Sequence, residues 1–244
     1  MKNLLVILLF LIAGVGIYYT TNISIANNYT DGNLYIQNIP PEKEEIEKKE
    51  VYNLVSLIEL NTNLFIDLKY ASTNNFTGKQ IYPYSAKAYL TENTANKLMA
   101  ANEELYKLGY RIKIWDAYRP HKYQYTLREV AEEQNFATAS YIANPDTGSH
   151  HNRGASVDIT LTDLEGHEID MPTEFDHFGP ESSIFYDGCT EEQKTNRELL
   201  GKIMEKHGFR RISSEWWHFD DTDYMNYPIL EVDFDELQIM QKKV

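Results

Sequence analysis

Residues 149–160 read SHHNRGASVDIT, and the second half of this stretch has the pattern of a β-strand. From residue 155 onward, apolar and polar side chains alternate in ASVDITLTD. Successive side chains of a strand point to opposite faces, so the predicted apolar face comprises Val157, Ile159 and Leu161. Asp158 then shares the polar face with Ser156 and Thr160. The stretch therefore predicts a half-buried strand with a carboxylate that follows two adjacent histidines, His150 and His151.

Other segments around this strand predict a mixture of helices and strands. Apolar residues at helical spacing predict a helix over residues 91–108, and RIKIW at 111–115 alternates as a strand does. A capping box of Thr190 and Gln193 predicts a second helix that ends near Gly208. FRRISSEWWHF, residues 209–219, is interpreted as a returning strand. Without a regular βαβ repeat, this order predicts an α+β fold with a small, largely antiparallel central sheet flanked by helices.

Composition and charge exclude several classes of function. The 244 residues are 42% hydrophobic, with 18 Tyr, 10 Phe and 3 Trp, which is enough for a packed core. A formal net charge of −14 leaves no basic face for phosphates, so nucleic acid is not an expected partner. The single cysteine, Cys189, excludes an intrachain disulfide and a multi-cysteine metal site. Any metal must therefore bind to histidines and carboxylates.

The N-terminal 50 residues differ in composition from the rest. Residues 4–19 form an uncharged apolar run, so we expect residues 1–26 to be a signal peptide or a membrane anchor. Residues 27–50 end in PPEKEEIEKKE and are expected to be a flexible charged linker. Residues 51–244 are then a catalytic domain, exported to the periplasm or another extracytoplasmic location, with membrane contact only through the N-terminal segment. The oligomeric state is left open.

Three short segments could together form a metal site: DAYRP (116–120), SHHNRGASVD (149–158) and SEWWHFD (214–220). A catalytic zinc site commonly has three protein ligands and leaves a position for water. His151, Asp158 and His218 would supply such a set, and Glu215 could accept a proton from the water. However, residues three apart point to opposite faces of a regular strand. Glu215 and His218 therefore require a bend or a strand end between them.

These segments resemble the D-alanyl-D-alanine dipeptidase family, the vancomycin-resistance-type zinc dipeptidases among the metallo D,D-peptidases. The family motif S-x-H-x-x-G-x-A-x-D matches Ser149, His151, Gly154 and Asp158, with Ser156 in place of the alanine. The E-x-x-H motif matches EWWH at 215–218. Further likeness extends through DLKYASTNNFTGK (67–79), WDAYRP (115–120) and CTEEQ (189–193). The resemblance thus covers nearly all of residues 51–227.

The resemblance implies a zinc D,D-peptidase (hedgehog-like) fold, one Zn²⁺ per chain and a dipeptide substrate that is hydrolysed to two D-alanines. The motif phase selects His151 rather than His150 as a ligand, together with Asp158 and His218. Glu215 then acts as general base, and Arg119 stabilises the oxyanion. Asp176 matches a residue near the substrate amino terminus. Ser149 and Tyr84 match residues near its carboxylate, and Asp116 and Tyr70 match other substrate-site positions.

Two other readings of the same residues remain. The protein could be a zinc D,D-carboxypeptidase or endopeptidase acting on peptidoglycan stem peptides, which an exported location would favour. It could also be a non-catalytic zinc-binding module, although an intact Glu215 and Arg119 argue against this. A comparison of a free dipeptide with a longer peptide as substrate distinguishes a dipeptidase from a carboxypeptidase or endopeptidase. Bound metal without hydrolysis of either substrate would identify a binding module.

Overall fold

A five-stranded sheet is built around the two strands that the alternating patterns predict. The computed structural model describes residues 53–60, 63–134 and 141–242. The strand order is β2-β4-β5-β7-β6, in which only the β2–β4 pair is parallel. The bounds are β2 Phe65–Ile66, β4 Arg111–Asp116, β5 Ser156–Thr162, β6 Phe209–Arg211 and β7 His218–Asp221. The predicted α+β class and the largely antiparallel sheet are therefore confirmed.

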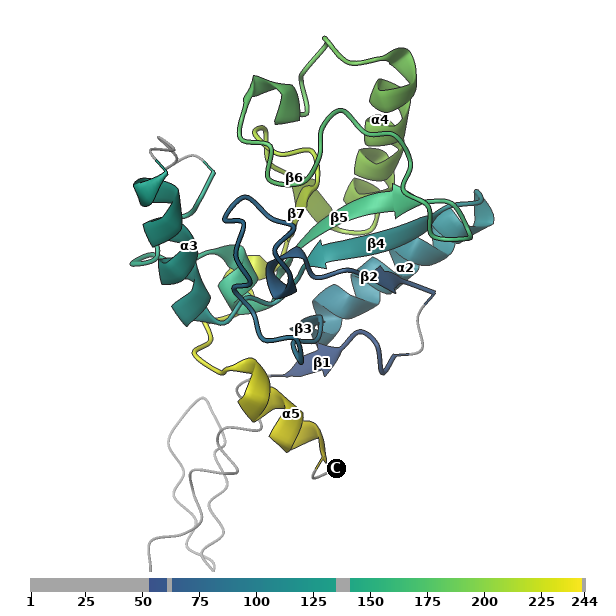
Figure 1. Ribbon diagram of the computed structural model, residues 1–244. Coiled ribbons are helices and arrows are strands. Elements are labelled where there is room, and N and C mark those ends of the chain that lie inside the picture. Colours follow the sequence, from purple (N-terminus) through teal and green to yellow (C-terminus); the bar gives the residue numbers. More distant parts are fainter. Residues whose placement is uncertain (1–52, 61–62, 135–140, 243–244) are drawn as a thin grey trace, which may run out of the picture. The chain divides into compact units, whose positions relative to one another are not determined.

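Two long helices cover this sheet. In Figure 1, α2 (Glu92–Lys107) lies along β4, and α4 (Glu191–Lys206) lies near β5 and β6. Both helices were predicted, α2 from the spacing of its apolar residues and α4 from its capping box. The capping box at the start of α4 is present: the Gln193 amide donates to Thr190 Oγ1 (3.1 Å), and the Thr190 amide donates to Gln193 Oε1 (3.0 Å). The helices and the sheet enclose the larger apolar cluster, which includes Trp115, Trp216 and Trp217.

The sequence patterns did not predict the elements around a second apolar cluster. These are the antiparallel pair β1 (Leu54–Ser56) and β3 (Tyr89–Thr91) and the helices α3 (His121–Glu133) and α5 (Phe234–Lys242). Short 3-10 turns lie at Lys69–Ala71, His150–Arg153, Pro180–Ser182 and Tyr224–Asn226. A strand of three residues is too short to show alternation. Tyr82, Tyr118 and Phe234 join these elements in the second cluster.

The segment interpreted as one returning strand, residues 209–219, is instead two strands. β6 ends at Arg211 and β7 begins at His218, with a turn between them. Trp216 in this turn donates its backbone amide to the Ser182 carbonyl (2.9 Å), so the chain leaves the sheet before it returns. This interruption provides the strand end that Glu215 and His218 require. The prediction of a continuous strand was wrong because the apolar residues of the turn are buried by packing outside the sheet.

The predicted signal peptide or anchor (1–26) and the linker (27–50) lie outside the described residues. No helix within the described ranges has both the length and the apolar composition needed to span a membrane.

Candidate metal centre and active site

Two histidines and an aspartate converge between β5, β7 and the 3-10 turn His150–Arg153. Asp158 and His218 are directly opposite each other in the β5–β7 register. His151 Nε2 lies 3.2 Å from His218 Nδ1 and 3.4 Å from Asp158 Oδ1, and His218 Nδ1 lies 2.9 Å from the same oxygen. All three side chains are buried. The structure thus assembles the predicted ligand set from segments that are 67 residues apart in the chain.

In each of the two imidazoles, the nitrogen that points away from Asp158 has a hydrogen-bond acceptor. This acceptor determines which nitrogen of the neutral ring carries the proton. His151 Nδ1 lies 2.7 Å from the Ala117 carbonyl oxygen, and His218 Nε2 lies 2.9 Å from Asp220 Oδ1. Each of these nitrogens donates, so the other nitrogen of each neutral ring turns a lone pair toward Asp158. Two lone pairs and a carboxylate that face one another require a shared cation. This donor set is one that Zn²⁺ binds.

In the metal-free protein, a proton on His218 supplies part of the positive charge that the two lone pairs and the carboxylate require. Burial lowers the pKa of His218, but the hydrogen bonds and charges of Asp158 and Asp220 outweigh it and hold the pKa well above its usual value. Burial likewise raises the pKa of Asp158, yet the two histidines hold it well below its ordinary range. The centre therefore attracts positive charge, in the form of a proton or a metal ion.

Glu215 lies beside the three converging side chains. Its Oε2 is 4.0 Å from His218 Nδ1, and its side chain belongs to the turn before β7. The residue is 7% exposed, and burial raises its pKa to about 8 in the metal-free protein, with the Asp158 and Asp176 charges adding to the shift. A carboxyl group with a pKa near neutrality can accept and return a proton under physiological conditions.

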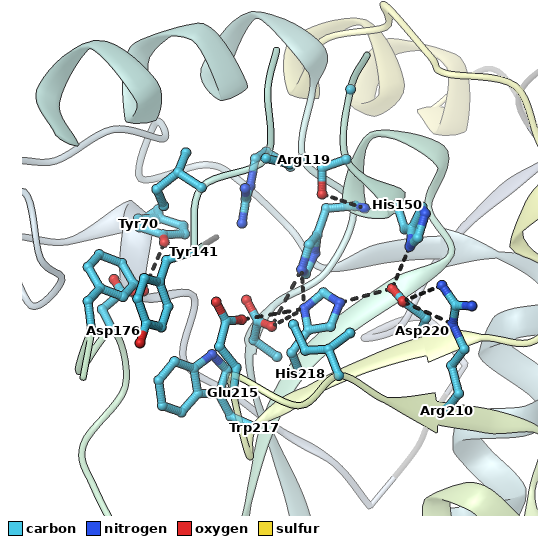
Figure 2. Close-up of a pocket in the computed structure, with 18 residues that line it drawn as sticks. Tyr70, Arg119, Tyr141, His150, Asp176, Arg210, Glu215, Trp217, His218 and Asp220 are labelled. Carbon is cyan, nitrogen blue, oxygen red and sulfur yellow. Dashed lines mark hydrogen bonds and ion pairs between the residues drawn. The ribbon is translucent and has the colours of Figure 1, made fainter. Parts of the chain in front are cut away.

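Arg119 lies across the cavity from Glu215 and His218, as Figure 2 shows. Two side chains orient its guanidinium through hydrogen bonds. Nε and Nη2 donate to Asp116 Oδ2 (3.1 and 2.7 Å), and Nη1 donates to Gln124 Oε1 (2.8 Å). A backbone hydrogen bond also joins Arg119 to the 3-10 turn His150–Arg153, because the Arg119 amide donates to the His151 carbonyl (3.1 Å). The remaining guanidinium donors can therefore reach a substrate oxygen with little rearrangement.

Asp116 has a different place from the one expected for a substrate contact. It is fully buried, does not line the cavity, and accepts from Arg119, the Ala117 amide and the Tyr82 hydroxyl. Its carboxylate therefore positions Arg119, and the substrate contact that the resemblance implies for Asp116 stays a prediction. Tyr84 also lies outside the cavity wall, with its side chain 84% exposed, and its contact with the substrate carboxylate stays a prediction.

Asp176 and Tyr70 lie together at one end of the cavity. The Tyr70 hydroxyl donates to Asp176 Oδ1 (3.1 Å), and the Phe76 amide donates to Oδ2 (3.2 Å). Asp176 has a φ of 59°, a left-handed conformation that few non-glycine residues adopt. Burial raises its pKa to about 8. A half-buried carboxyl at the cavity wall, held by two donors, is a suitable partner for a ligand cation.

Ser149 also lines the cavity, but it has a structural role as well. Its hydroxyl accepts from the His151 amide (3.3 Å) in a capping box with Asn152. The cavity has a volume of about 280 Å³, and its wall includes Ser149, His151, Asp158, Asp176, Glu215 and His218. Sequence reasoning thus placed eight of ten expected side chains at this cavity; Asp116 and Tyr84 are the exceptions.

Several residues at the site escaped the sequence analysis. Asp220 is two residues after His218 on β7, so it shares a face with that histidine, a relation that strand periodicity could have revealed. His150 was set aside as a neighbour, yet its Nδ1 lies 2.8 Å from Asp220 Oδ1. Gln124 on α3 accepts from Arg119, and Tyr141 lines the cavity. Neither gave a signal in the sequence, because only tertiary packing brings them to these positions.

Comparisons with known proteins agree with the motifs. The peptidase M15 family model, described as D-Ala-D-Ala dipeptidase, matches residues 34–236. A D-alanyl-D-alanine dipeptidase of Escherichia coli (strain K12) is 35% identical over 181 residues, covering 74% of this chain and 91% of the relative. A D-alanyl-D-alanine dipeptidase of Enterococcus faecium is 32% identical over 184 residues, covering 67% of this chain and 91% of the relative.

A solved structure also resembles the chain, though more weakly. It is the vancomycin-resistance D,D-dipeptidase VanXYg in complex with a D-Ala-D-Ala phosphinate analogue, with 20% identity and a TM-score of 0.38. The likeness covers 78% of this chain and 70% of that one. The sequence comparisons, not this structural one, establish the relationship.

Proposed function

Since the chain belongs to the D-Ala-D-Ala dipeptidase family of M15 peptidases, we propose that it hydrolyses the free dipeptide D-Ala-D-Ala to two D-alanines with one bound zinc ion. The observation that carries this proposal is the convergence of His151, Asp158 and His218 beside Glu215 on one cavity wall. The fold is then the zinc D,D-peptidase (hedgehog-like) fold that the motifs imply.

His151, Asp158 and His218 would hold the zinc through Nε2, a carboxylate oxygen and Nδ1. When bound, zinc supplies Lewis acidity that activates water and polarises the scissile carbonyl. Glu215 takes the proton of the attacking water and passes it to the leaving amine. Arg119 donates to the oxygen on which negative charge develops as the carbonyl carbon becomes tetrahedral. Asp116 and Gln124 keep the guanidinium oriented for this contact.

The remaining cavity residues suit the two charged ends of a dipeptide. Asp176 would pair with the substrate ammonium, which also favours the ionised form of a carboxyl whose pKa is otherwise raised to about 8. Tyr70 holds Asp176 in place. Ser149 would donate its hydroxyl to the substrate carboxylate. The cavity volume of about 280 Å³ provides room for a dipeptide between these groups.

A competition between substrates tests this proposal. Full-length, zinc-loaded protein is given D-Ala-D-Ala or a stem pentapeptide that ends in D-Ala-D-Ala, and released D-alanine is measured for each. We expect efficient release from the dipeptide and little from the pentapeptide. A clear preference for the pentapeptide would identify a carboxypeptidase instead. Stoichiometric zinc without hydrolysis of either substrate would identify a binding module.

We also propose that the enzyme acts outside the cytoplasmic membrane, with residues 1–26 as signal peptide or anchor, 27–50 as linker and 51–244 as the catalytic domain. The uncharged run at 4–19 supports this proposal. Cell fractionation with N-terminal sequencing tests it. Recovery of the activity from the cytoplasm with residues 1–26 intact would refute it.

A further inference from the structure

Asp220 is the centre of a buried polar cluster at the end of the cavity opposite Asp176 (Figure 2). Its side chain is 1% exposed. Oδ1 lies 2.9 Å from His218 Nε2, 2.7 Å from Ser156 Oγ and 2.8 Å from His150 Nδ1. Oδ2 accepts from Arg210 through Nε (3.3 Å) and Nη2 (3.1 Å). Both oxygens are thus fully engaged by protein side chains, which leaves neither for a substrate.

The position of Asp220 also excludes a direct metal contact. It faces Nε2 of His218, whereas Nδ1 of the same ring faces His151 and Asp158. A buried carboxylate is costly unless it is paired, and Arg210 with three further donors provides that pairing. The cluster therefore holds one carboxylate at a defined place behind one histidine of the metal site.

The two histidines of the site are oriented by different means. His151 donates to a backbone carbonyl, that of Ala117, which no substitution removes. His218 donates to the Asp220 side chain, so its orientation depends on a single residue. Partners of this kind fix the tautomer and the ring orientation of metal-binding histidines and increase their basicity as ligands.

We propose that Asp220 is a positioning residue for the metal centre, which keeps the proton of His218 on Nε2 and turns Nδ1 toward the zinc. Arg210 and His150 in turn hold Asp220. This inference rests on the proposed function, because it assumes that His218 is a zinc ligand.

Zinc affinity of the full-length chain tests the inference without reference to catalysis. Zn²⁺ is titrated against a competing chromophoric chelator for the wild type, Asp220→Ala and Asp220→Asn. We expect Asp220→Ala to weaken zinc binding by about 10- to 100-fold. Asp220→Asn keeps a side-chain oxygen for His218 but loses the ion pair with Arg210, so we expect a smaller loss. Asp220→Ala that folds and binds zinc within twofold of wild type overturns the proposal.

Asp221→Asn is the matched control. Asp221 is the next residue of β7, is equally buried, and faces the other side of the sheet, where it pairs with Lys97 and Thr94. We expect this variant to lower thermal stability while zinc affinity stays within twofold of wild type. An equal loss of zinc affinity in the two asparagine variants would mean that any buried charge on β7 matters, and would overturn a specific role for Asp220.

A second measurement distinguishes positioning from general destabilisation. Nitrogen-15 NMR of the zinc-loaded protein should show the His218 proton on Nε2 in the wild type and in Asp221→Asn, and its loss or exchange broadening in Asp220→Ala. If Asp220→Ala does not fold, Asp220→Asn carries both tests. A wild-type chain that binds no zinc would refute the proposed function, whereas intact zinc binding in every Asp220 variant would refute this inference alone.

Discussion

Individual side chains acquire their chemistry at this site from burial and from their immediate partners. Glu215 is an ordinary glutamate in the sequence, but burial raises its pKa to about 8 in the metal-free protein. Arg119 is held by Asp116 and Gln124 and not by a surface carboxylate. These properties concern single residues, so substitutions of single residues test them.

Glu215→Gln should remove turnover while leaving the metal in place. The amide has nearly the same shape but cannot accept a proton, and general base catalysis contributes about 10²- to 10⁴-fold. We expect kcat/KM for D-Ala-D-Ala to fall by at least that factor, with zinc content close to one per chain. Steady-state kinetics and metal analysis measure both quantities. Unchanged kcat/KM would remove Glu215 from the reaction.

The neighbouring histidines should respond differently to replacement by alanine. His151 turns Nε2 to the metal site, whereas His150 contacts Asp220 and packs on the Tyr224 ring at 3.8 Å between ring centroids. We expect His151→Ala to abolish stoichiometric zinc binding and His150→Ala to retain most of it. Equilibrium dialysis measures the bound zinc. The reverse pattern would mean that the motif is aligned one residue out of phase.

At the scale of elements, the metal site depends on how a 3-10 turn joins a strand. The turn that carries His151 ends at Gly154, and β5, which carries Asp158, begins two residues later. Gly154 has a φ of +65°, and a Cβ there would lie 2.5 Å from Leu54 Cδ2. The conformation and the close packing of this glycine thus determine the distance between two of the three ligands.

Gly154→Ala should therefore destabilise the protein more than Gly109→Ala does. Gly109 is also left-handed, with a φ of +89°, but a Cβ there has no neighbour within 4 Å. We expect Gly109→Ala to cost about 1–2 kcal/mol of unfolding free energy through backbone strain alone. Gly154→Ala should exceed this cost and also weaken zinc binding. Urea unfolding and zinc titration measure the two effects, and equal unfolding costs would contradict the packing argument.

At the scale of the whole molecule, the cavity brings together one buried and one half-buried acidic group, Glu215 and Asp176, that the metal-free fold cannot keep ionised without cost. Burial raises the pKa values of both Glu215 and Asp176 to about 8, from 4.5 and 3.8 respectively. The folded protein therefore binds more protons than the unfolded chain between about pH 4 and pH 8. Stability contributed by such groups is present at low pH and declines as pH rises through this window.

The metal-free protein should consequently lose stability between about pH 5 and pH 8. His218 acts in the same direction above its unfolded pKa of about 6.5, since its folded pKa is raised. Each group adds a slope of at most about 1.4 kcal/mol per pH unit. We expect Glu215→Gln with Asp176→Asn to flatten the slope measured by urea unfolding in the presence of a chelator.

Zinc should reverse this trend. A cation at the centre favours the ionised carboxylates and the neutral imidazoles, so zinc loading should raise the unfolding free energy more at pH 8 than at pH 5. Unfolding of zinc-loaded and chelated protein at both pH values measures this difference. A larger effect at pH 5 would be inconsistent with these pKa shifts.

Local patterns in the sequence were sufficient for α2, α4, β4 and β5, because their signals lie within one element. The capping box at Thr190 and the alternation in β5 are interactions between near neighbours in the chain. The ligand set also followed from spacing within short motifs, and its members do converge. Short paired strands such as β1 and β3 could not be predicted, since long-range pairing stabilises them.

The residue types and motif spacing of this chain were enough to identify the candidate ligands, the base and the family. Tertiary packing settled what no local pattern encodes. It ends β6 before Glu215 and buries Asp116 against Arg119. It also leaves the Tyr84 side chain exposed to solvent and brings Asp220 into contact with His218. Orientation, burial and protonation depend on groups that are distant in the chain, and these become neighbours only when the sheet and its loops are assembled.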